Sequence, residues 1–274
     1  MLIGDTHKRA TFDKIDVRSD VNPTDRDIRW FKHIERHGAL TSTQLIAWTA
    51  DTHRCRDTAL RRLQALRAVG FLYLPKQQRA CERAEFRPYV YDLAFKGFQY
   101  LANCGLREET ARPTGHWWHL HETAMFTAQI DLEARGRGFR YIPAHEILER
   151  AGSTLAISIG RRNLIPDQIF AIDYGGLFRA FMVEVDRGTE PIASKSTRKS
   201  WKSSLALYDE AFRLGLLNHH YGLKAPVQVL WAHRTGARRG AFEKLLGALS
   251  ASTRQRHICS RIDSVGAVTA PWTA

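Results

Sequence analysis

The chain has 274 residues, a length that allows one large domain or two modest ones with a core that needs no disulfides. Its 41 Lys and Arg exceed its 28 Asp and Glu, and the formal net charge at pH 7 is +13. A surplus of this size favours a polyanionic partner, most often nucleic acid. A generally basic protein without a specific partner is the alternative that charge alone leaves open.

The sequence offers no sign of a membrane or secreted protein. No stretch approaches the ~20 apolar residues that a membrane-spanning helix needs. Residues 1–14 lack the apolar core of a signal peptide. The four cysteines are scattered without a C-x-x-C pair, which disfavours a disulfide framework or a zinc ribbon. We therefore expect a cytoplasmic protein.

The N-terminal region begins with a polar segment, residues 1–24, that has no periodicity and is expected to be a disordered arm. A first helix is predicted over residues 25–37, where Thr24 or Asp25 can cap its start and Gly38 ends it. One face of this helix is apolar because three residues recur at helical spacing: Ile28, Phe31 and Ile34.

The third predicted helix carries the most information. A second, short helix ends at Trp48, and the third covers residues 52–69 before Gly70. One side of the third helix is apolar and consists of Ala59, Leu60, Leu63 and Leu66. At about 100° per residue, Arg54 and Arg61 fall on the opposite side, and Arg62 flanks them.

A hairpin follows, with strands predicted at residues 71–74 and 89–93, and a helix over residues 94–103 closes the unit. Three helices followed by a hairpin with a basic tip is the winged-helix order, so residues 25–104 are predicted to be a winged-helix DNA-binding domain. In that class the third helix enters the major groove and the hairpin loop meets phosphates. A protein-docking module with a solvated basic face is the alternative. The predicted DNA contacts are Arg54, Arg61, Arg62, Lys76, Arg79 and Arg83.

A linker is predicted at residues 105–116, which contain glycine and proline but no apolar run. A second domain is predicted over residues 117–264. It would begin with a long helix, continue with several strands, and end with helix, strand and helix, which is a mixed α/β order. Residues 265–274 are expected to be a loose tail.

The second domain contains a cluster of carboxylates. In a strand, Glu184 and Asp186 point to one face, and a turn over residues 173–176 can pair that strand with the one after Pro166-Asp167. Three converging carboxylates would form an oxygen-only site suited to Mg²⁺ or Mn²⁺. Salt bridges to nearby arginines and lysines, or solvent exposure at the strand ends, are the alternatives.

The arrangement Pro166-Asp167, a hairpin, then Glu184-x-Asp186 resembles the metal-binding core of PD-(D/E)xK nucleases. The whole layout resembles the plasmid replication-relaxation family, over roughly residues 25–250. The motifs that carry this resemblance are His121 in the long helix, Pro166-Asp167, Glu184-Val-Asp186-Arg-Gly-Thr-Glu190, and a helix with Lys199, Lys202 and Tyr208. The resemblance implies a restriction-endonuclease-like fold and a role in handling the DNA of plasmids or mobile elements.

One position departs from the nuclease pattern, because Asp186 stands where an active nuclease would have lysine. A lysine from the following helix, Lys195, Lys199 or Lys202, can take that place, and Glu122 on the long helix can add a fourth carboxylate. The predicted catalytic residues are Asp167, Glu184 and Lys199. The predicted metal ligands are Asp167, Glu184, Asp186 and Glu122. Lys199 and Lys202 can also hold a DNA backbone.

Three functions stay open at this point. The first is a duplex-DNA-binding protein of a plasmid or mobile element, acting in replication, relaxation or transfer without strong catalysis. The second is an endonuclease dependent on Mg²⁺ or Mn²⁺ and targeted by its winged helix. The third is a winged-helix transcriptional regulator. Double-stranded DNA is the expected partner in all three, together with other proteins of the mobile element or a second copy of the chain.

Overall fold

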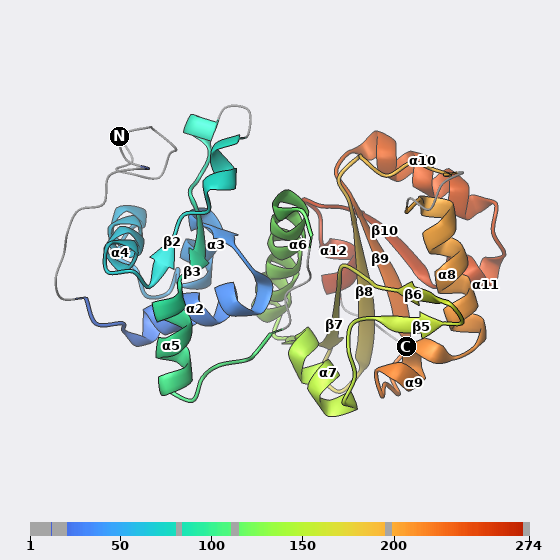
Figure 1. Cartoon of the computed structure of the whole chain (residues 1–274), viewed down its shortest axis with the longest axis horizontal. Helices are drawn as coiled ribbons and strands as arrows, with labels where there is room; N and C mark the ends of the chain where they lie inside the picture. Colours follow the sequence, from blue (N-terminus) through green and yellow to red (C-terminus); the bar gives the residue numbers. More distant parts are fainter. Residues whose placement is uncertain (1–11, 13–20, 81–83, 111–114, 195–198, 271–274) are drawn as a thin grey trace. The chain divides into compact units, whose positions relative to one another are not determined.

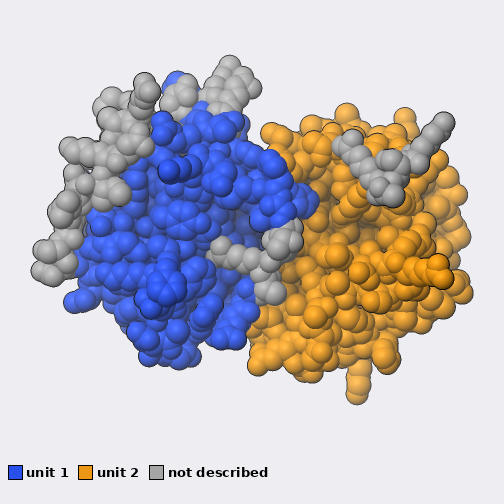
Figure 2. Space-filling model, in the orientation of Figure 1, with its two compact units in different colours: residues 1–132 blue, residues 133–274 orange. Residues whose placement is uncertain are grey.

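The computed structural model describes residues 12, 21–80, 84–110, 115–194 and 199–270. Contacts divide the chain into two compact units, residues 1–132 and 133–274 (Figures 1 and 2). The fold mixes helices with one three-stranded, one five-stranded and one two-stranded sheet in the part of the chain that is described. None of the helices described is both long and apolar enough to cross a bilayer.

The first unit contains the elements expected at residues 25–103, with one further strand and two short 3₁₀ helices. In chain order they are α2 (Asp25–His37), β1 (Leu40–Thr41), α3 (Ser42–Trp48), α4 (Arg56–Ala68), β2 (Leu72–Tyr73), η1 (Lys76–Ala80), η2 (Ala84–Phe86), β3 (Val90–Leu93) and α5 (Phe95–Asn103). The predicted hairpin is confirmed, since β2 and β3 pair antiparallel with Leu72 opposite Leu93. The added strand β1 pairs with the other edge of β3.

The third helix is shorter than predicted, because α4 begins at Arg56 rather than at Thr52. Both the backbone N–H and the hydroxyl of Thr52 donate to the carbonyl of Thr49 at 2.9 Å, which closes a turn after α3. Arg54 therefore lies in the turn before the helix. The apolar side of α4 is buried as predicted, around Leu60 and Leu63.

The boundary between the units differs from the predicted one at residue 117. The long helix α6 (Trp117–Gly136) begins in the first unit and crosses the division after Leu132. Ala124 and Ala128 on this helix belong to the same buried cluster as Phe31 of α2. The predicted linker also packs against the first unit, because both carboxylate oxygens of Glu108 accept hydrogen bonds from Arg36.

The second unit is built on a five-stranded mixed sheet with the order β10-β9-β8-β7-β4. Strands β8, β9 and β10 are parallel to one another, and β7 and β4 are antiparallel to their neighbours. The elements are β4 (Arg140–Ile142), α7 (Ala144–Ala151), β5 (Ile157–Ile159), β6 (Arg162–Leu164), β7 (Gln168–Asp173), β8 (Phe178–Asp186), α8 (Trp201–Arg213), α9 (Leu216–His220), β9 (Val227–His233), α10 (Gly236–Gly247), α11 (Ala251–Arg254), β10 (His257–Arg261) and α12 (Gly266–Thr269).

Helices α8 and α10 cover one face of this sheet. Their buried aromatic residues, Trp201, Tyr208 and Phe242, pack with Trp231 of β9 in a single cluster. Burying large aromatic side chains between a sheet and its helices supplies much of the stabilisation of such a unit. Because Trp201 is the first residue of α8, this packing also positions the start of α8 against the sheet.

The predicted loose tail is wrong for its described part. Val265 and Val268 are buried, and residues 266–269 form α12. The hydroxyl of Tyr174 donates to the carbonyl of Val268 at 2.6 Å, and the hydroxyl of Thr269 donates to Glu133 at 2.7 Å. Two valines at this spacing are too weak a periodic signal to predict a docked helix.

Candidate carboxylate and lysine site

The pairing of β7 with β8 positions two of the predicted site residues. The turn that joins the strands is stabilised by Asp173, whose Oδ1 accepts hydrogen bonds from the N–H groups of Gly175 and Gly176 at 3.0 and 2.6 Å. Both glycines have a positive φ, a conformation that L side chains rarely adopt. The predicted hairpin is therefore confirmed, with Gln168 opposite Val183.

Asp167 extends this ladder by one residue. Its backbone N–H donates to the carbonyl of Val183 at 2.9 Å, and the N–H of Val185 donates to its Oδ2 at 2.7 Å. The carboxylate of Asp167 thus turns towards β8, on which Glu184 stands between these two valines. Glu184 is buried, with a relative exposure of 3 %.

Lys199 joins the two carboxylates. Its Nζ lies 2.7 Å from Oε2 of Glu184, 4.0 Å from Oδ1 of Asp167 and 3.6 Å from Oε1 of Glu190. The three predicted catalytic residues are therefore brought together, and the lysine comes from the segment before α8 rather than from the strand. Lys195 and Arg83, also singled out in the sequence, lie outside the described residues.

The entrance to α8 holds Lys199 in this place. The side chain of Ser200 accepts a hydrogen bond from the N–H of Ser203 at 3.3 Å, which caps the helix. The N–H of Trp201 donates to the carbonyl of Pro191 at 3.1 Å. The helix start is thus tied to the segment that follows β8.

Burial governs the charge state of Glu184. Burial raises the pKa of Glu184 to about 7; Lys199 opposes that rise and the nearby Asp167 adds to it. The hydroxyl of Tyr208 donates to Oε1 of Glu184 at 2.6 Å, and burial together with this carboxylate raises the pKa of Tyr208 well above its usual value. For Lys199, burial alone would lower the pKa, but Glu184, Asp167 and Glu190 outweigh it and the net pKa is raised.

Asp186, predicted as a metal ligand, instead makes an ion pair with a different set of partners. Its carboxylate accepts from Arg238 at 2.8 and 2.9 Å, from the N–H of Gly188 at 2.9 Å, and lies 3.2 Å from Nδ1 of His233. Burial alone would raise the pKa of Asp186, but His233, Arg238 and the N–H of Gly188 lower it to about 2. Arg238 also donates to the carbonyl of Glu190 at 2.6 Å, so this pair fixes the loop after β8.

These partners of Asp186 were missed in the sequence because they come from β9 and α10. His233 faces Asp186 through the parallel register of β8 and β9, and Arg238 lies 52 residues further along the chain. Predicting either contact requires knowing that β9 lies beside β8 in the sheet.

Three further residues singled out in the sequence are Glu122, Lys202 and His121. Glu122 lies on the part of α6 that belongs to the first unit. Lys202 is exposed on the first turn of α8. His121, named in the sequence motif, is buried; burial lowers its pKa to about 4, although Nδ1 lies 2.9 Å from the carbonyl of Ala39.

In the first unit, Arg54, Arg61, Lys76 and Arg79 are exposed. Arg62 is different. Its guanidinium donates to Asp27 at 2.6 and 3.1 Å and to the carbonyl of Asn22 at 2.7 Å. Asp27 is fully buried, so Arg62 compensates a buried carboxylate within the unit, and its contact with DNA stays a prediction.

No curated protein and no solved structure matches this chain. A family model described as replication-relaxation matches residues 31–227, a span from α2 to the start of β9 that includes Asp167, Glu184 and Lys199. The match covers well over half of the sequence and confirms the resemblance found in the motifs. The chain belongs to the replication-relaxation family.

Proposed function

We propose that this chain binds duplex DNA of a plasmid or other mobile element and cleaves it in a reaction that requires a divalent metal ion, as part of replication or relaxation. The observation that carries the proposal is the position of Lys199, whose Nζ is 2.7 Å from Glu184 and 4.0 Å from Asp167. Two carboxylates with one ammonium at the end of a strand hairpin can hold a metal ion and a phosphate side by side.

The first unit supplies the DNA-binding half of the proposal, as a winged helix with α4 as its recognition helix. Support comes from the element order, with three helices before the β2–β3 hairpin, and from the sheet order β1-β3-β2. Arg54 is exposed just before α4, Arg61 is exposed on α4, and Lys76 is exposed beyond β2. Arginine can bind base edges in the major groove, and lysine neutralises phosphates.

Asp167 and Glu184 would hold the metal ion, and their oxygen atoms fit Mg²⁺ or Mn²⁺. A metal ion bound there stabilises negative charge on a phosphate and makes water a better nucleophile. The raised pKa of Glu184 fits this role, because a buried carboxylate that gains a cation need not take up a proton. Lys199 stays protonated at neutral pH and can neutralise a non-bridging oxygen of the scissile phosphate.

The test is nicking of supercoiled plasmid in Mg²⁺ or Mn²⁺. We expect Asp167→Asn and Lys199→Met each to lower the rate by about 100-fold or more, the usual cost of removing one charge-stabilising group. Lys244→Met is the matched control, because Lys244 is exposed on α10. Nicking that survives Asp167→Asn unchanged would overturn the catalytic proposal.

A non-catalytic DNA-binding protein is the second candidate. It is favoured by one observation: both oxygens of Glu184 already accept hydrogen bonds, one from Tyr208 and one from Lys199. The same plasmid assay separates the two candidates. Wild-type protein that shifts the plasmid in a binding gel but leaves it supercoiled with either metal ion supports the second.

A further inference from the structure

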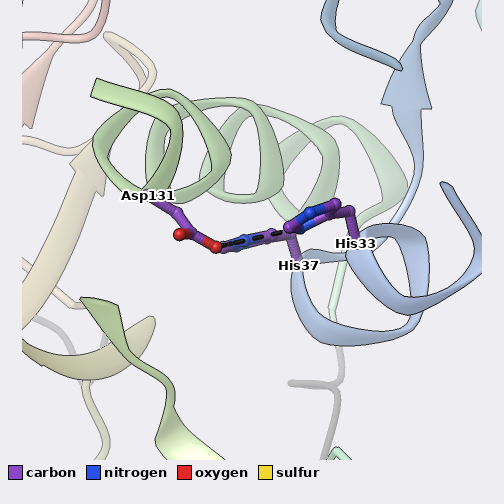
Figure 3. Close-up of side chains that lie close together, drawn as sticks. All are labelled: His33, His37 and Asp131. Atoms are coloured by element: carbon purple, nitrogen blue, oxygen red, sulfur yellow. Dashed lines mark hydrogen bonds and ion pairs between the residues drawn. The ribbon is translucent and has the colours of Figure 1, made fainter. Parts of the chain in front are cut away.

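A second cluster of metal-ligating side chains lies in the first unit, whereas the carboxylate and lysine site lies in the second. His33 and His37 are four residues apart on α2, so they share one face of the helix, and Asp131 faces them from α6 (Figure 3). The side chains of all three are buried, and the ligand atoms of the three residues lie within 4.8 Å of one another. Among the residues described, this is the group whose geometry suits a metal ion.

The distances suit tetrahedral coordination. Oδ2 of Asp131 lies 3.0 Å from Nε2 of His37 and 3.8 Å from Nδ1 of His33. Ligand atoms about 2.0–2.2 Å from a zinc ion are roughly 3.3–3.5 Å apart, which lies between these two values. Two imidazoles and one carboxylate form a common zinc-ligand set, and the pair of histidines at i and i+4 provides two ligands from one turn of helix.

Nδ1 of His37 faces Thr127, and Nε2 faces Asp131. The hydrogen bonds of Thr127 therefore bear on which of the two nitrogens carries the hydrogen. The hydroxyl of Thr127 can donate to the carbonyls of Thr123 and Ala124, at 3.1 and 3.3 Å. Its oxygen lies 3.0 Å from Nδ1 of His37 and accepts from the tautomer that carries hydrogen on Nδ1. In a neutral imidazole with hydrogen on Nδ1, Nε2 presents a lone pair, and this lone pair points at a carboxylate oxygen 3.0 Å away.

Two lone pairs at this distance repel each other unless a cation lies between them. A proton on Nε2 is one such cation. A metal ion serves equally and uses the nitrogen of His33 as well. A hydrogen bond on the far nitrogen of a ligating histidine is the usual support for such a site.

Arg36 is the competing cation. Its Nη1 lies 3.2 Å from Oδ2 of Asp131, but two other nitrogens of the same guanidinium bind both oxygens of Glu108, at 2.6 and 2.9 Å. Lys32 lies 3.5 Å from Glu108 as well. Arg36 can therefore keep its bidentate pair with Glu108 when another cation takes Oδ2 of Asp131.

We propose that Nδ1 of His33, Nε2 of His37 and Oδ2 of Asp131 bind one divalent transition-metal ion of the zinc class. With three protein ligands the fourth position is left for water or another donor. The ion would join α2 to α6 within the first unit. Imidazole ligands distinguish this site from the oxygen-only site proposed for Mg²⁺ or Mn²⁺ in the second unit.

The test is titration of the metal-free full-length chain with zinc against a chromophoric chelator. We expect one zinc per wild-type chain, and no binding at this site in the double variant His33→Gln/His37→Gln. The matched control His219→Gln, an exposed histidine of α9, should bind as wild type does. Absence of zinc binding by the wild type, or equal binding by the double variant, would overturn the proposal.

A milder variant covers the case in which the double variant does not fold. Thr127→Val keeps a β-branched side chain of the same size but removes the acceptor for Nδ1 of His37. We expect it to weaken zinc binding by about 10-fold to 100-fold, as is usual for the loss of a supporting hydrogen bond. The wild-type complex with Co²⁺ should also show the visible absorption of a tetrahedral site. Unchanged zinc affinity in Thr127→Val together with an octahedral Co²⁺ spectrum would contradict the assignment.

Discussion

The two carboxylates at the end of β8 are two residues apart on the same strand, yet their surroundings are opposite. Asp186 accepts from Arg238 and lies against His233, and these partners lower its pKa to about 2. Glu184 is as deeply buried, but burial raises its pKa to about 7. Asp186 is therefore a fixed charge, whereas Glu184 can exchange a proton or a cation. Neighbouring carboxylates whose pKa values are shifted in opposite directions mark candidate catalytic sites.

The same contrast occurs on α4 between neighbouring arginines. Arg61 is exposed, whereas Arg62 binds the buried carboxylate of Asp27 at 2.6 Å. Each pair thus contains one residue that supports the fold and one that remains available for function. The predictions below test both pairs.

Breaking the anchor of Asp186 should have the largest effect on stability. Arg238→Met leaves a buried carboxylate without its main partner, and we expect it to lower the free energy of unfolding by about 3 kcal/mol or more. Arg239→Met is the matched control, since Arg239 pairs with Glu243 on the surface, where such pairs contribute about 0–1 kcal/mol. Urea unfolding measures both variants. Equal losses in the two would show that Asp186 is not anchored as described.

Glu184 should make stability depend on pH in the opposite sense from an ordinary carboxylate. Its pKa is about 7 in the folded chain against a usual 4.5, so the folded state holds a proton that the unfolded state has lost between these values. The wild type should therefore lose stability, on the order of 2–3 kcal/mol, as pH rises from 4.5 through 7. Glu184→Gln should lack this decline. The check is the difference between the two unfolding free energies across this pH range, and a constant difference would contradict the environment described for Glu184.

The arginine pair on α4 is tested by DNA binding, where the expected change starts at about 1 kcal/mol. Arg61→Ala should weaken binding of duplex DNA by roughly 1 kcal/mol if it meets phosphate, and by up to about 3 kcal/mol if it binds a base edge. Arg62→Ala should lower the free energy of unfolding and leave the DNA affinity of the folded fraction unchanged. Fluorescence anisotropy at several salt concentrations measures the affinity. Loss of affinity in Arg62→Ala alone would reverse the assignment.

Local patterns in the sequence were enough to predict the helix at residues 25–37, the β2–β3 hairpin and the pairing of β7 with β8. These depend on periodicity and on turn residues such as Asp173, Gly175 and Gly176. The strand β1 was missed because two residues show no periodicity. The start of α4 was predicted too early, at Thr52. Residues 52–55 fit a helical spacing, but Thr52 closes a turn with the carbonyl of Thr49 and lies outside the helix.

The contacts that decide the role of each charged residue could not be predicted in the same way. Asp27 lies 35 residues from Arg62, and Arg238 lies 52 residues from Asp186. Such pairs follow from the packing of helices and from the register of parallel strands, which a single sequence does not fix. Lys199 was one of three candidate lysines. Because α8 starts at Trp201, Lys199 precedes the helix and reaches Glu184, whereas Lys202 is exposed on the first turn.

The most direct test of this account compares Glu184→Gln with Asp186→Asn in the plasmid nicking assay, with rates normalised to the folded fraction of each protein. Glu184→Gln should abolish nicking in Mg²⁺ or Mn²⁺, because Glu184 would hold the ion. Folded Asp186→Asn should still nick, because Asp186 anchors the loop after β8. Full nicking by Glu184→Gln, or loss of nicking in Asp186→Asn alone, would contradict it.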